Sequence, residues 1–267
     1  MGRRRVPSGL NARALPRFFV SPETLQAGVL PSEIAHQVRH VLRLGEGDAI
    51  CLLDNTGWAH FARLKSPSGH EVRFKLTGRE RLHTELPLAI SVLQALVRNE
   101  KAEQVVRFCT AAGASQILFA PAERSLVVWD EAKRQARRQR WQAIAREEAE
   151  LACRALCPQV AILPDWWTAI EELPHPRLLL DEWEGVRPLG ERLRTLPLSH
   201  GMGEGLGVRD LSLIVGPEGG FTPHERERMV HQHGCLPVSL GARVLRTELA
   251  AFYALAQIEA FLTCMSN

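Results

Sequence analysis

In this chain the run Leu211-Ser212-Leu213-Ile214-Val215 ends directly in Gly216-Pro217-Glu218-Gly219-Gly220. A short, mostly apolar run bounded by Gly and Pro is typical of a parallel strand that is buried on both faces. In open α/β sheets, ligands bind in the loops that follow such strands. This stretch therefore predicts an α/β domain with a parallel sheet and places a candidate ligand site in the glycine turn.

A helix is expected directly after this turn. Thr222 is a good N-cap, Pro223 fits the first helical position, and Glu225 stands three residues after the cap. Gly234 is expected to end the helix. A second short apolar run then ends at Gly241 and is followed by another helix start. The sequence thus predicts two glycine turns, each at the end of a strand.

The composition is that of a globular protein, with 45% hydrophobic and 24% charged residues among 267. No apolar run approaches the roughly 20 residues that span a bilayer. The first 17 residues are rich in arginine and contain no apolar segment of the kind found in a secretory signal. We therefore expect a cytoplasmic protein without a membrane partner.

The cysteines follow neither a disulfide pattern nor a usual metal-binding pattern. They stand at positions 51, 109, 153, 157, 235 and 264, without a C-x-x-C pair. Cys153 and Cys157, four residues apart on a predicted helix, could hold zinc together with His231 and His233. Zinc ligands usually come in more closely spaced pairs, so we interpret both cysteines as packing residues and expect no metal.

The positive charge is unevenly distributed, although the net charge is only +3. The N-terminal arm carries only basic charges, and a further basic cluster comprises Lys133, Arg134, Arg137, Arg138 and Arg140. Clustered cations favour a polyanion such as nucleic acid. A solvated helix face explains the same cluster equally well.

Residues 17–82 are predicted to form a small β-rich domain after a basic arm of residues 1–16. Alternating apolar and polar residues indicate strands, and helical spacing indicates one helix. The strands are expected at 17–20, 49–54, 58–64 and 71–76, and the helix at 31–43. Closely spaced turns favour a compact barrel. Its exposed basic residues suit an RNA-binding accessory domain; they are Arg63, Lys65, Arg73, Lys75, Arg79 and Arg81.

Residues 83–267 are predicted to form a second domain, in which strands alternate with helices as in a parallel sheet. The strands are expected at 88–93, 116–120, 160–163, 177–181 and 211–215, with helices from 99 to Gly113 and from 131 to 155. The segment 196–207 is rich in glycine and is therefore predicted to be a surface loop. Its glycines do not have the G-x-G-x-x-G spacing of a dinucleotide site, and no strand leads into it, so such a site is not expected.

With these elements in order, the chain resembles the ribosomal RNA small subunit methyltransferase E family, within the SPOUT class of S-adenosylmethionine-dependent RNA methyltransferases. The resemblance covers nearly the whole chain. It rests on the first glycine turn, on Leu240-Gly241-Ala242-Arg243-Val244-Leu245-Arg246-Thr247-Glu248, and on the shorter motifs Arg17-Phe18-Phe19, His40-Val41-Leu42-Arg43 and Glu123-Arg124-Ser125. The two glycine motifs at this separation are a specific combination.

The resemblance implies an α/β domain whose parallel sheet is tied into a deep trefoil knot, together with an N-terminal PUA-like β-barrel and a homodimer. It also implies S-adenosylmethionine as the cofactor and methyl transfer to N3 of a uridine in 16S ribosomal RNA or the small ribosomal subunit. General topology rules do not lead to a knot, so this expectation rests on the resemblance alone.

A pocket for S-adenosylmethionine needs close backbone approach, which glycines permit because they have no Cβ. It also needs hydrogen bonds to the adenine edge, which backbone groups near Leu240 and Leu245 are expected to supply. Each glycine taken singly is explained by a tight turn, whereas two such turns after neighbouring strands favour a ligand site. The expected cofactor-binding residues are Leu180, Glu182, Gly216, Pro217, Glu218, Gly219, Gly220, Leu240, Gly241 and Leu245.

Two residues are predicted to take part in catalysis, Arg246 and Glu248. Uracil N3 must lose a proton, so a positive group should stabilise the developing anion. Arg246 is the candidate, with phosphate binding or an ion pair with Glu248 as the alternatives. Glu218 or Glu248 would serve as the base only if burial raised its pKa.

RNA is expected to contact residues that hold phosphates without reading the base sequence. These are Arg17, Arg43, Arg98, Arg124, Ser125, Arg138 and Arg154. The target uridine must reach a pocket, so we expect it to be unpaired.

The chain departs from the family pattern at Phe108, Ala111, Leu151 and Leu249, where polar residues are usual. Two other functions stay open: an RNA-binding ribosome-assembly protein on the same scaffold without catalysis, and a SPOUT methyltransferase with a different RNA target. A degraded cofactor loop would mark the first, and residues 216–220 show none. A P-loop phosphotransferase is disfavoured, because the turn lacks the required Lys-Ser/Thr pair.

Overall fold

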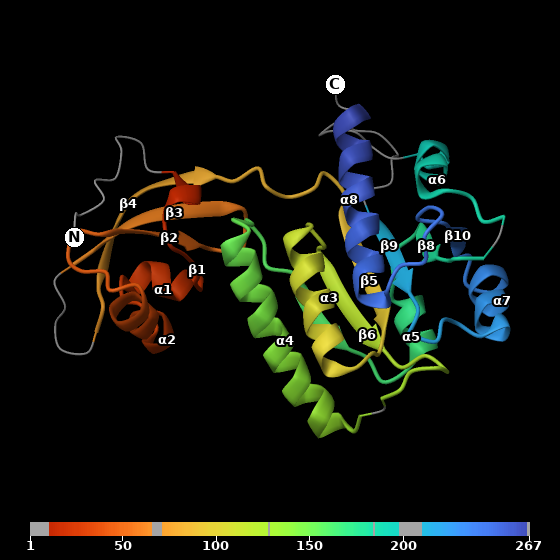
Figure 1. The fold of residues 1–267 in the computed structure, drawn as a ribbon. Helices are drawn as coiled ribbons and strands as arrows, with labels where there is room; N and C mark the ends of the chain where they lie inside the picture. The colour runs from red at the N-terminus through yellow and green to blue at the C-terminus, as the bar shows by residue number, and fades with distance from the viewer. Residues whose placement is uncertain (1–10, 66–70, 128, 184, 198–209, 266–267) are drawn as a thin grey trace. The chain divides into compact units, whose positions relative to one another are not determined.

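The computed structural model describes residues 11–65, 71–127, 129–183, 185–197 and 210–265. It divides the chain into two compact units, one of residues 1–85 with 149–157 and the other of residues 86–148 with 158–267. The elements of both are labelled in Figure 1. The predicted glycine-rich loop from residue 198 on, and the first ten residues of the predicted basic arm, lie outside the described residues.

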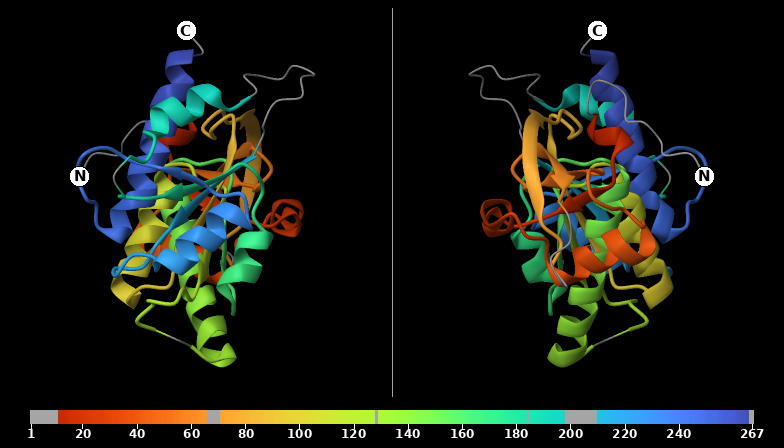
Figure 2. Two further views of the ribbon diagram at one scale, coloured as in Figure 1. Left: turned by 90° about the vertical axis from the view of Figure 1, so that its right-hand side faces the viewer. Right: turned by 90° about the vertical axis from the view of Figure 1, so that its left-hand side faces the viewer.

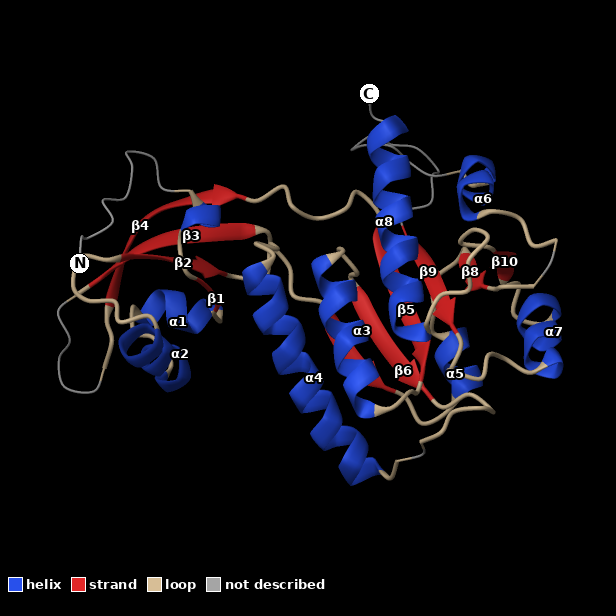
Figure 3. Cartoon of the chain, viewed as in Figure 1, coloured by secondary structure: helices blue, strands red, loops and turns tan. Residues whose placement is uncertain are grey.

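A four-stranded sheet in the order β1-β2-β3-β4 forms the centre of the first unit (Figure 3). Its strands are β1 (Arg17–Phe19), β2 (Ala49–Leu53), β3 (Trp58–Leu64) and β4 (Phe74–Arg81). β1 is parallel to β2, and the other pairs are antiparallel. The helical segments are η1 (Ala12–Ala14), α1 (Pro22–Ala27), α2 (Ser32–His36) and the π-helix η2 (Gln37–Val41).

The packed part of the first unit begins before Arg17. Ala12 and Leu15 are buried, and they pack in one cluster with Phe19 and Cys153. The end of the predicted arm is therefore part of the fold, because its apolar side chains fill the core of the sheet. The chain also returns to this unit at residues 149–157, which sequence order alone does not indicate.

Six parallel strands form the sheet of the second unit, in the order β10-β8-β9-β5-β6-β7. They are β5 (Ala89–Ala95), β6 (Gln116–Ala120), β7 (Gln159–Ile162), β8 (Arg177–Leu180), β9 (Asp210–Val215) and β10 (Leu236–Val238). The predicted α/β class with a parallel sheet is confirmed. The trefoil knot stays a prediction.

Helices cover both faces of this sheet, as Figures 1 and 2 show. They are α3 (Asn99–Ala111), α4 (Glu131–Leu151), α5 (Trp166–Glu171), α6 (Leu189–Thr195), α7 (Pro223–His231) and α8 (Thr247–Met265). Ile170 of α5 and Met229 of α7 pack in one cluster with Leu118 of β6. The next residue, Phe119, faces the opposite side and contacts Trp141 of α4 with ring centroids 4.5 Å apart. α3 and α8 lie against each other, and α8 also contacts β9.

The helix predicted from 131 to 155 ends earlier, at Leu151. Leu151 is 65% exposed, and Ala152 after it is also exposed. The core-facing stripe of α4, which includes the fully buried Trp141, does not extend to these residues.

Length and composition alone would also let α8 span a bilayer, because its 19 residues include a window of mean hydropathy 1.2. The expectation that no apolar run approaches the roughly 20 residues that span a bilayer is therefore wrong for α8. One side of α8 packs in the core through Ala254, Leu255 and Ile258. Another side leaves Leu249 and Phe252 exposed.

Candidate active site

Three adjacent strands, β10, β8 and β9, end at the same edge of the parallel sheet. The loops that follow them line one cavity of about 670 Å³, together with Lys101 of α3 and Arg124. This size is within the range of small-molecule and cofactor sites. All ten residues expected to bind the cofactor line this cavity: Leu180, Glu182, Gly216, Pro217, Glu218, Gly219, Gly220, Leu240, Gly241 and Leu245.

Backbone geometry explains three of the glycines in the two turns. Gly220 has a φ of 66° and Gly241 a φ of 123°, which side-chain-bearing residues rarely adopt. A Cβ on Gly216 would lie 3.2 Å from Cε2 of Phe221, closer than side chains normally pack. The two turns thus have the structure that their sequences predict, and both line the cavity.

The N-terminal end of α7 has the predicted capping box. The Thr222 hydroxyl accepts a hydrogen bond from the Glu225 backbone N–H (3.1 Å), and the Glu225 carboxylate accepts one from the Thr222 N–H (2.8 Å). The other Glu225 oxygen accepts a hydrogen bond from the backbone N–H of Glu123 (2.8 Å). Glu225 therefore joins the loop after β6 to the loop after β9, which exceeds the helix-capping role expected from the sequence.

A glutamine that the sequence analysis missed holds two walls of the cavity together. Gln94, fully buried near the end of β5, donates hydrogen bonds to the Gly216 carbonyl (3.2 Å) and to the Thr247 hydroxyl (2.9 Å). The Thr247 hydroxyl in turn donates to the same carbonyl (2.6 Å). The start of α8 is thereby tied to the first glycine turn. A polar residue in an otherwise buried strand was the signal that could have identified Gln94.

Lys101 is a second missed residue. Its ammonium lies 3.4 Å from Oε1 of Glu218 and 3.6 Å from Oε2 of Glu248. The Glu248 side chain is only 6% exposed, so the lysine supplies the positive charge that a buried carboxylate requires. One cation from α3 thus faces acidic side chains from the first glycine turn and from the start of α8.

Arg246 lines the cavity and is exposed. Within the described part of the chain its guanidinium makes no hydrogen bond or ion pair, whereas Glu248 pairs with Lys101. The ion pair between Arg246 and Glu248, one of the alternatives, is therefore not formed. The guanidinium of Arg246 is available for a ligand.

Of the residues expected to contact RNA, Arg124 also lines the cavity. Its Nη1 donates a hydrogen bond to the Gly219 carbonyl (2.9 Å). The Ser125 hydroxyl accepts a hydrogen bond from the Ala122 N–H (3.0 Å) and so stabilises the turn after β6. Arg43 and Arg98 are exposed, and Arg138 is partly exposed.

Arg17 has an internal structural role, which corrects its assignment to RNA. Its Nε donates to the Glu150 carbonyl (2.6 Å), and its terminal nitrogens donate to four further backbone carbonyls. These hydrogen bonds occupy the donors that a phosphate would need. The basic residue in this motif therefore stabilises the fold of the first unit.

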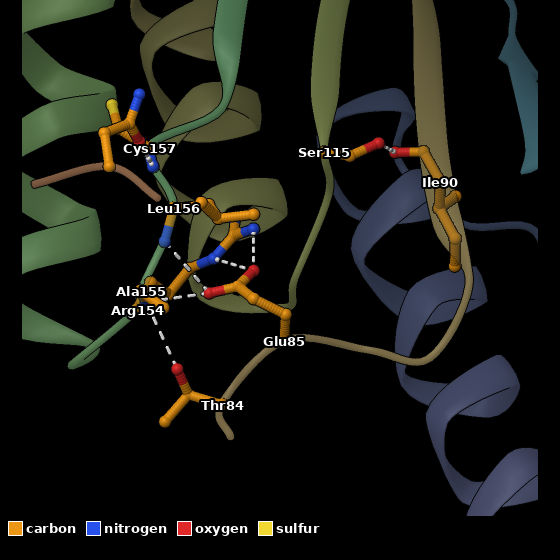
Figure 4. A network of polar contacts seen from close by, with 9 residues as sticks. Thr84, Glu85, Ile90, Ser115, Arg154, Ala155, Leu156 and Cys157 are labelled. Atoms are coloured by element: carbon orange, nitrogen blue, oxygen red, sulfur yellow. Dashed lines mark hydrogen bonds and ion pairs between the residues drawn. The ribbon is translucent and has the colours of Figure 1, made fainter. Parts of the chain in front are cut away.

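Arg154 is the second correction. Its side chain is buried, with 3% of the residue exposed, and its Nε donates to the Glu85 carboxylate (3.1 Å). The other Glu85 oxygen accepts hydrogen bonds from the Ala155 and Leu156 N–H groups (Figure 4). A buried arginine paired in this way cannot reach an RNA phosphate, so the network holds residues 154–156 in place.

The two cysteines considered as zinc ligands pack in the apolar cluster of the first unit. His231 and His233 belong to the second unit. In the described ranges no group of three or more His, Cys, Asp and Glu side chains is placed to hold a metal ion.

Comparison with known proteins identifies relatives over most of the chain. The protein-family model described as the RNA methyltransferase domain matches residues 84–259. Ribosomal RNA small subunit methyltransferase E of Synechocystis is 31% identical to this chain, and the match covers 92% of this chain and 78% of the relative. The Bacillus subtilis protein of the same name is 28% identical, and the match covers 91% of this chain and 96% of the relative. A similar solved structure is the crystal structure of ribosomal RNA small subunit methyltransferase E from Neisseria gonorrhoeae bound to S-adenosyl methionine. It matches with a TM-score of 0.77 and 28% sequence identity, over 92% of this chain and 97% of that chain.

Proposed function

The chain belongs to the ribosomal RNA small subunit methyltransferase E family, and we propose that it transfers a methyl group from S-adenosylmethionine to N3 of a uridine in 16S ribosomal RNA. The observation that supports this most directly is the single cavity formed by the two glycine turns and the loop after β8. A SPOUT methyltransferase with another RNA target, and an assembly protein without catalysis, are the alternatives that the experiments below separate.

The residues of the cavity fit the proposed cofactor. Buried Leu179, Val215 and Ala250 provide an apolar floor. Glycines in both turns line the cavity, and because they have no Cβ they let a ligand approach the backbone closely. Glu182 and Glu218 line the cavity and add negative charge, which suits a cationic sulfonium compound. When bound, S-adenosylmethionine supplies the methyl group.

Arg246 is assigned to stabilising the reacting base. The N3 proton of uracil must leave before or during the transfer, and negative charge then spreads over the two neighbouring carbonyl oxygens. A guanidinium that has no internal partner can donate hydrogen bonds to those oxygens. Both carboxylates pair with the Lys101 ammonium, Glu218 at 3.4 Å and Glu248 at 3.6 Å, so we assign them to holding this lysine and assign the N3 proton to solvent water.

RNA binding is assigned to the exposed cations, now without Arg17 and Arg154. Arg43, Arg98, Arg124 and Arg138 remain as candidates for contacts with phosphates of 16S RNA or the small ribosomal subunit. Such a substrate places the protein in the cytoplasm.

A homodimer is proposed on the basis of the exposed side of α8. Leu249 and Phe252 are 37% and 38% exposed, and the Phe252 ring lies 5.8 Å from that of Phe108 on α3. These residues form an apolar patch across two helices, including two of the positions where polar residues are usual. A second copy of the chain would cover it, and Phe252→Asp should shift the protein toward monomer in analytical ultracentrifugation.

The decisive experiment is mass spectrometric mapping of methylated uridines in 16S RNA from cells with and without this protein. One N3-methyluridine that disappears with the gene is the expected result. Unchanged 16S RNA with a lost methyl group in another RNA would support the alternative target. If no RNA methyl group is lost and calorimetry detects no S-adenosylmethionine binding, the assembly protein is favoured.

The role of Arg246 is tested with Arg246→Ala. We expect S-adenosylmethionine affinity to stay within about twofold and kcat to fall about 100-fold or more, as when one donor to a developing oxyanion is removed. Arg194→Ala is the matched control, because Arg194 is exposed on α6 and does not line the cavity. Loss of cofactor binding with normal turnover would contradict the assignment.

A further inference from the structure

The cavity has a buried floor and an exposed rim. At the rim, two large apolar residues, Trp183 and Val244, are 51% and 77% exposed. Single exposed apolar side chains are common on protein surfaces, but these two stand at the entrance of one cavity. A tryptophan there offers a large flat surface that a ring entering the cavity would cover.

Trp183 is held in place by a buried acid. Oδ1 of Asp181 accepts a hydrogen bond from the Trp183 backbone N–H (3.2 Å), and Oδ2 accepts one from Nε of Arg226 (2.6 Å). The Asp181 side chain is only 7% exposed, so its position is set by the packing around it. The residue that holds the backbone of Trp183 therefore also fixes a guanidinium.

That guanidinium covers the indole ring. Cζ of Arg226 lies over the ring at 4.9 Å from the centroid, within the range of a cation–π contact. One face of the ring is therefore occupied, while half of the residue stays exposed. The arrangement orients the indole before any ligand arrives, and it lines the same cavity as the glycine turns and Arg246.

We propose that Trp183 is the surface on which the target nucleobase of the RNA stacks when it enters the cavity. This inference rests on the proposed function, because a base that is chemically modified has to leave its RNA stack and enter a pocket. Enzymes of this kind hold such a base between aromatic or apolar side chains. Trp183 replaces the stacking that the base loses, and it places the base at the mouth of the cavity that holds Arg246.

A base in the RNA suits Trp183 better than the adenine of the cofactor does. The walls available for close backbone contact are the glycine turns, which lie beside the buried floor of Leu179, Val215 and Ala250. Trp183 belongs to the exposed rim, where a ligand arriving from outside is met first. Stacking of the adenine on Trp183 is the competing outcome that the experiment distinguishes.

The test compares Trp183→Ala, Trp183→Leu and Trp183→Phe with the wild type, in methylation of small ribosomal subunits from cells that lack the protein. Loss of base–aromatic stacking should raise the KM for the subunits by about tenfold to hundredfold in the Ala and Leu variants. Leu keeps apolar bulk but has no ring, whereas Phe should restore most of the loss. Affinity for S-adenosylmethionine, measured by calorimetry, should stay within about twofold in all three.

Three outcomes would overturn the proposal. If Trp183→Ala weakens S-adenosylmethionine binding and leaves the KM for the subunits unchanged, the ring stacks on the cofactor. If neither quantity changes, the ring has no role in binding. If Leu substitutes as well as Phe, bulk and not stacking is what matters. Thermal unfolding of each variant checks that the fold is retained.

Failure of the proposed function gives a different result, namely a wild-type protein that methylates no subunits. Stacking is then tested by binding alone, with an RNA hairpin whose loop contains unpaired uridines. The hairpin should quench tryptophan fluorescence in the wild type and quench it much less in Trp183→Phe. Equal quenching in the two proteins would overturn the proposal.

Discussion

Replacing Glu225 by glutamine tests how the loop after β6 is held against the loop after β9. Both oxygens of this carboxylate accept hydrogen bonds from backbone N–H groups, Oε1 from Glu123 and Oε2 from Thr222, each at 2.8 Å. The residue is 1% exposed, so water does not compete for either bond. Glutamine has the same shape but only one acceptor oxygen.

The expected loss of stability follows from this geometry. In Glu225→Gln the amide NH₂ group must face one of the two N–H donors, so one hydrogen bond to a charged acceptor is lost and one buried donor is left unpaired. A hydrogen bond to a charged group contributes about 1.5–3 kcal/mol. We therefore expect a loss of about 2–3 kcal/mol in the free energy of unfolding. Glu225→Ala removes both acceptors and should cost more.

Urea denaturation of the full chain measures this loss as a lower midpoint with an unchanged m-value. Glu227→Gln is the matched control, because Glu227 is exposed on the same helix. We also expect weaker S-adenosylmethionine binding in Glu225→Gln, since only Phe221 separates the first glycine turn from Thr222. If the two variants unfold at the same urea concentration, the carboxylate makes no net contribution and the argument from its two hydrogen bonds is wrong.

Two further predictions concern charged groups. Lys101→Met should lower the free energy of unfolding by about 1–2 kcal/mol, because it leaves the carboxylate of Glu248 buried without a positive partner. Thermal unfolding measures this loss, and the control Lys133→Met, at an exposed position, should change the stability little. Equal effects of the two substitutions would contradict this reasoning. The Thr168 backbone N–H donates to the Asp165 N-cap (2.7 Å) and lowers the pKa of that carboxyl below its ordinary value of 3.8. The stabilisation is therefore present above about pH 4 and is lost as the pH falls through the lowered pKa. Asp165→Asn keeps the cap but should remove this part of the acid dependence, and identical stability profiles between pH 5 and 2.5 would contradict the assignment.

Local patterns in the sequence were sufficient to predict many of the strands and helix ends of the second unit. The apolar run before Gly216 is strand β9, and Thr222 with Glu225 forms the capping box at the start of α7. Such features depend on residues within about four positions of each other, so they can be read in order along the chain. The same information was present but overlooked for α1, where Ser21 is the N-cap and Gly28 has a φ of 66°.

Strand limits were less well predicted where the pairing partner sets them. The strand expected at 71–76 is β4 at Phe74–Arg81. It is paired with β3, and the register shifts between Phe61 and Ala62. Cross-strand hydrogen bonds, and not the alternation of residues within the strand, determine where such a strand ends.

By itself, the sequence determined the α/β class and the two glycine turns, because strand burial, turn conformation and helix capping are local properties. The expectation that both turns belong to one cofactor pocket came from the family resemblance. Only the tertiary structure decided which polar residues face that cavity and which are internal. Gln94 binds Thr247 across 153 positions, and Arg154 binds Glu85 across 69. Arg154 pairs with Glu85, Arg226 lies over the ring of Trp183, and Arg246, within the described residues, is free to bind a ligand, although all three side chains have the same charge and size. The role of an arginine depends on which groups the folded chain places within about 3 Å of the guanidinium, the distance at which it can donate a hydrogen bond.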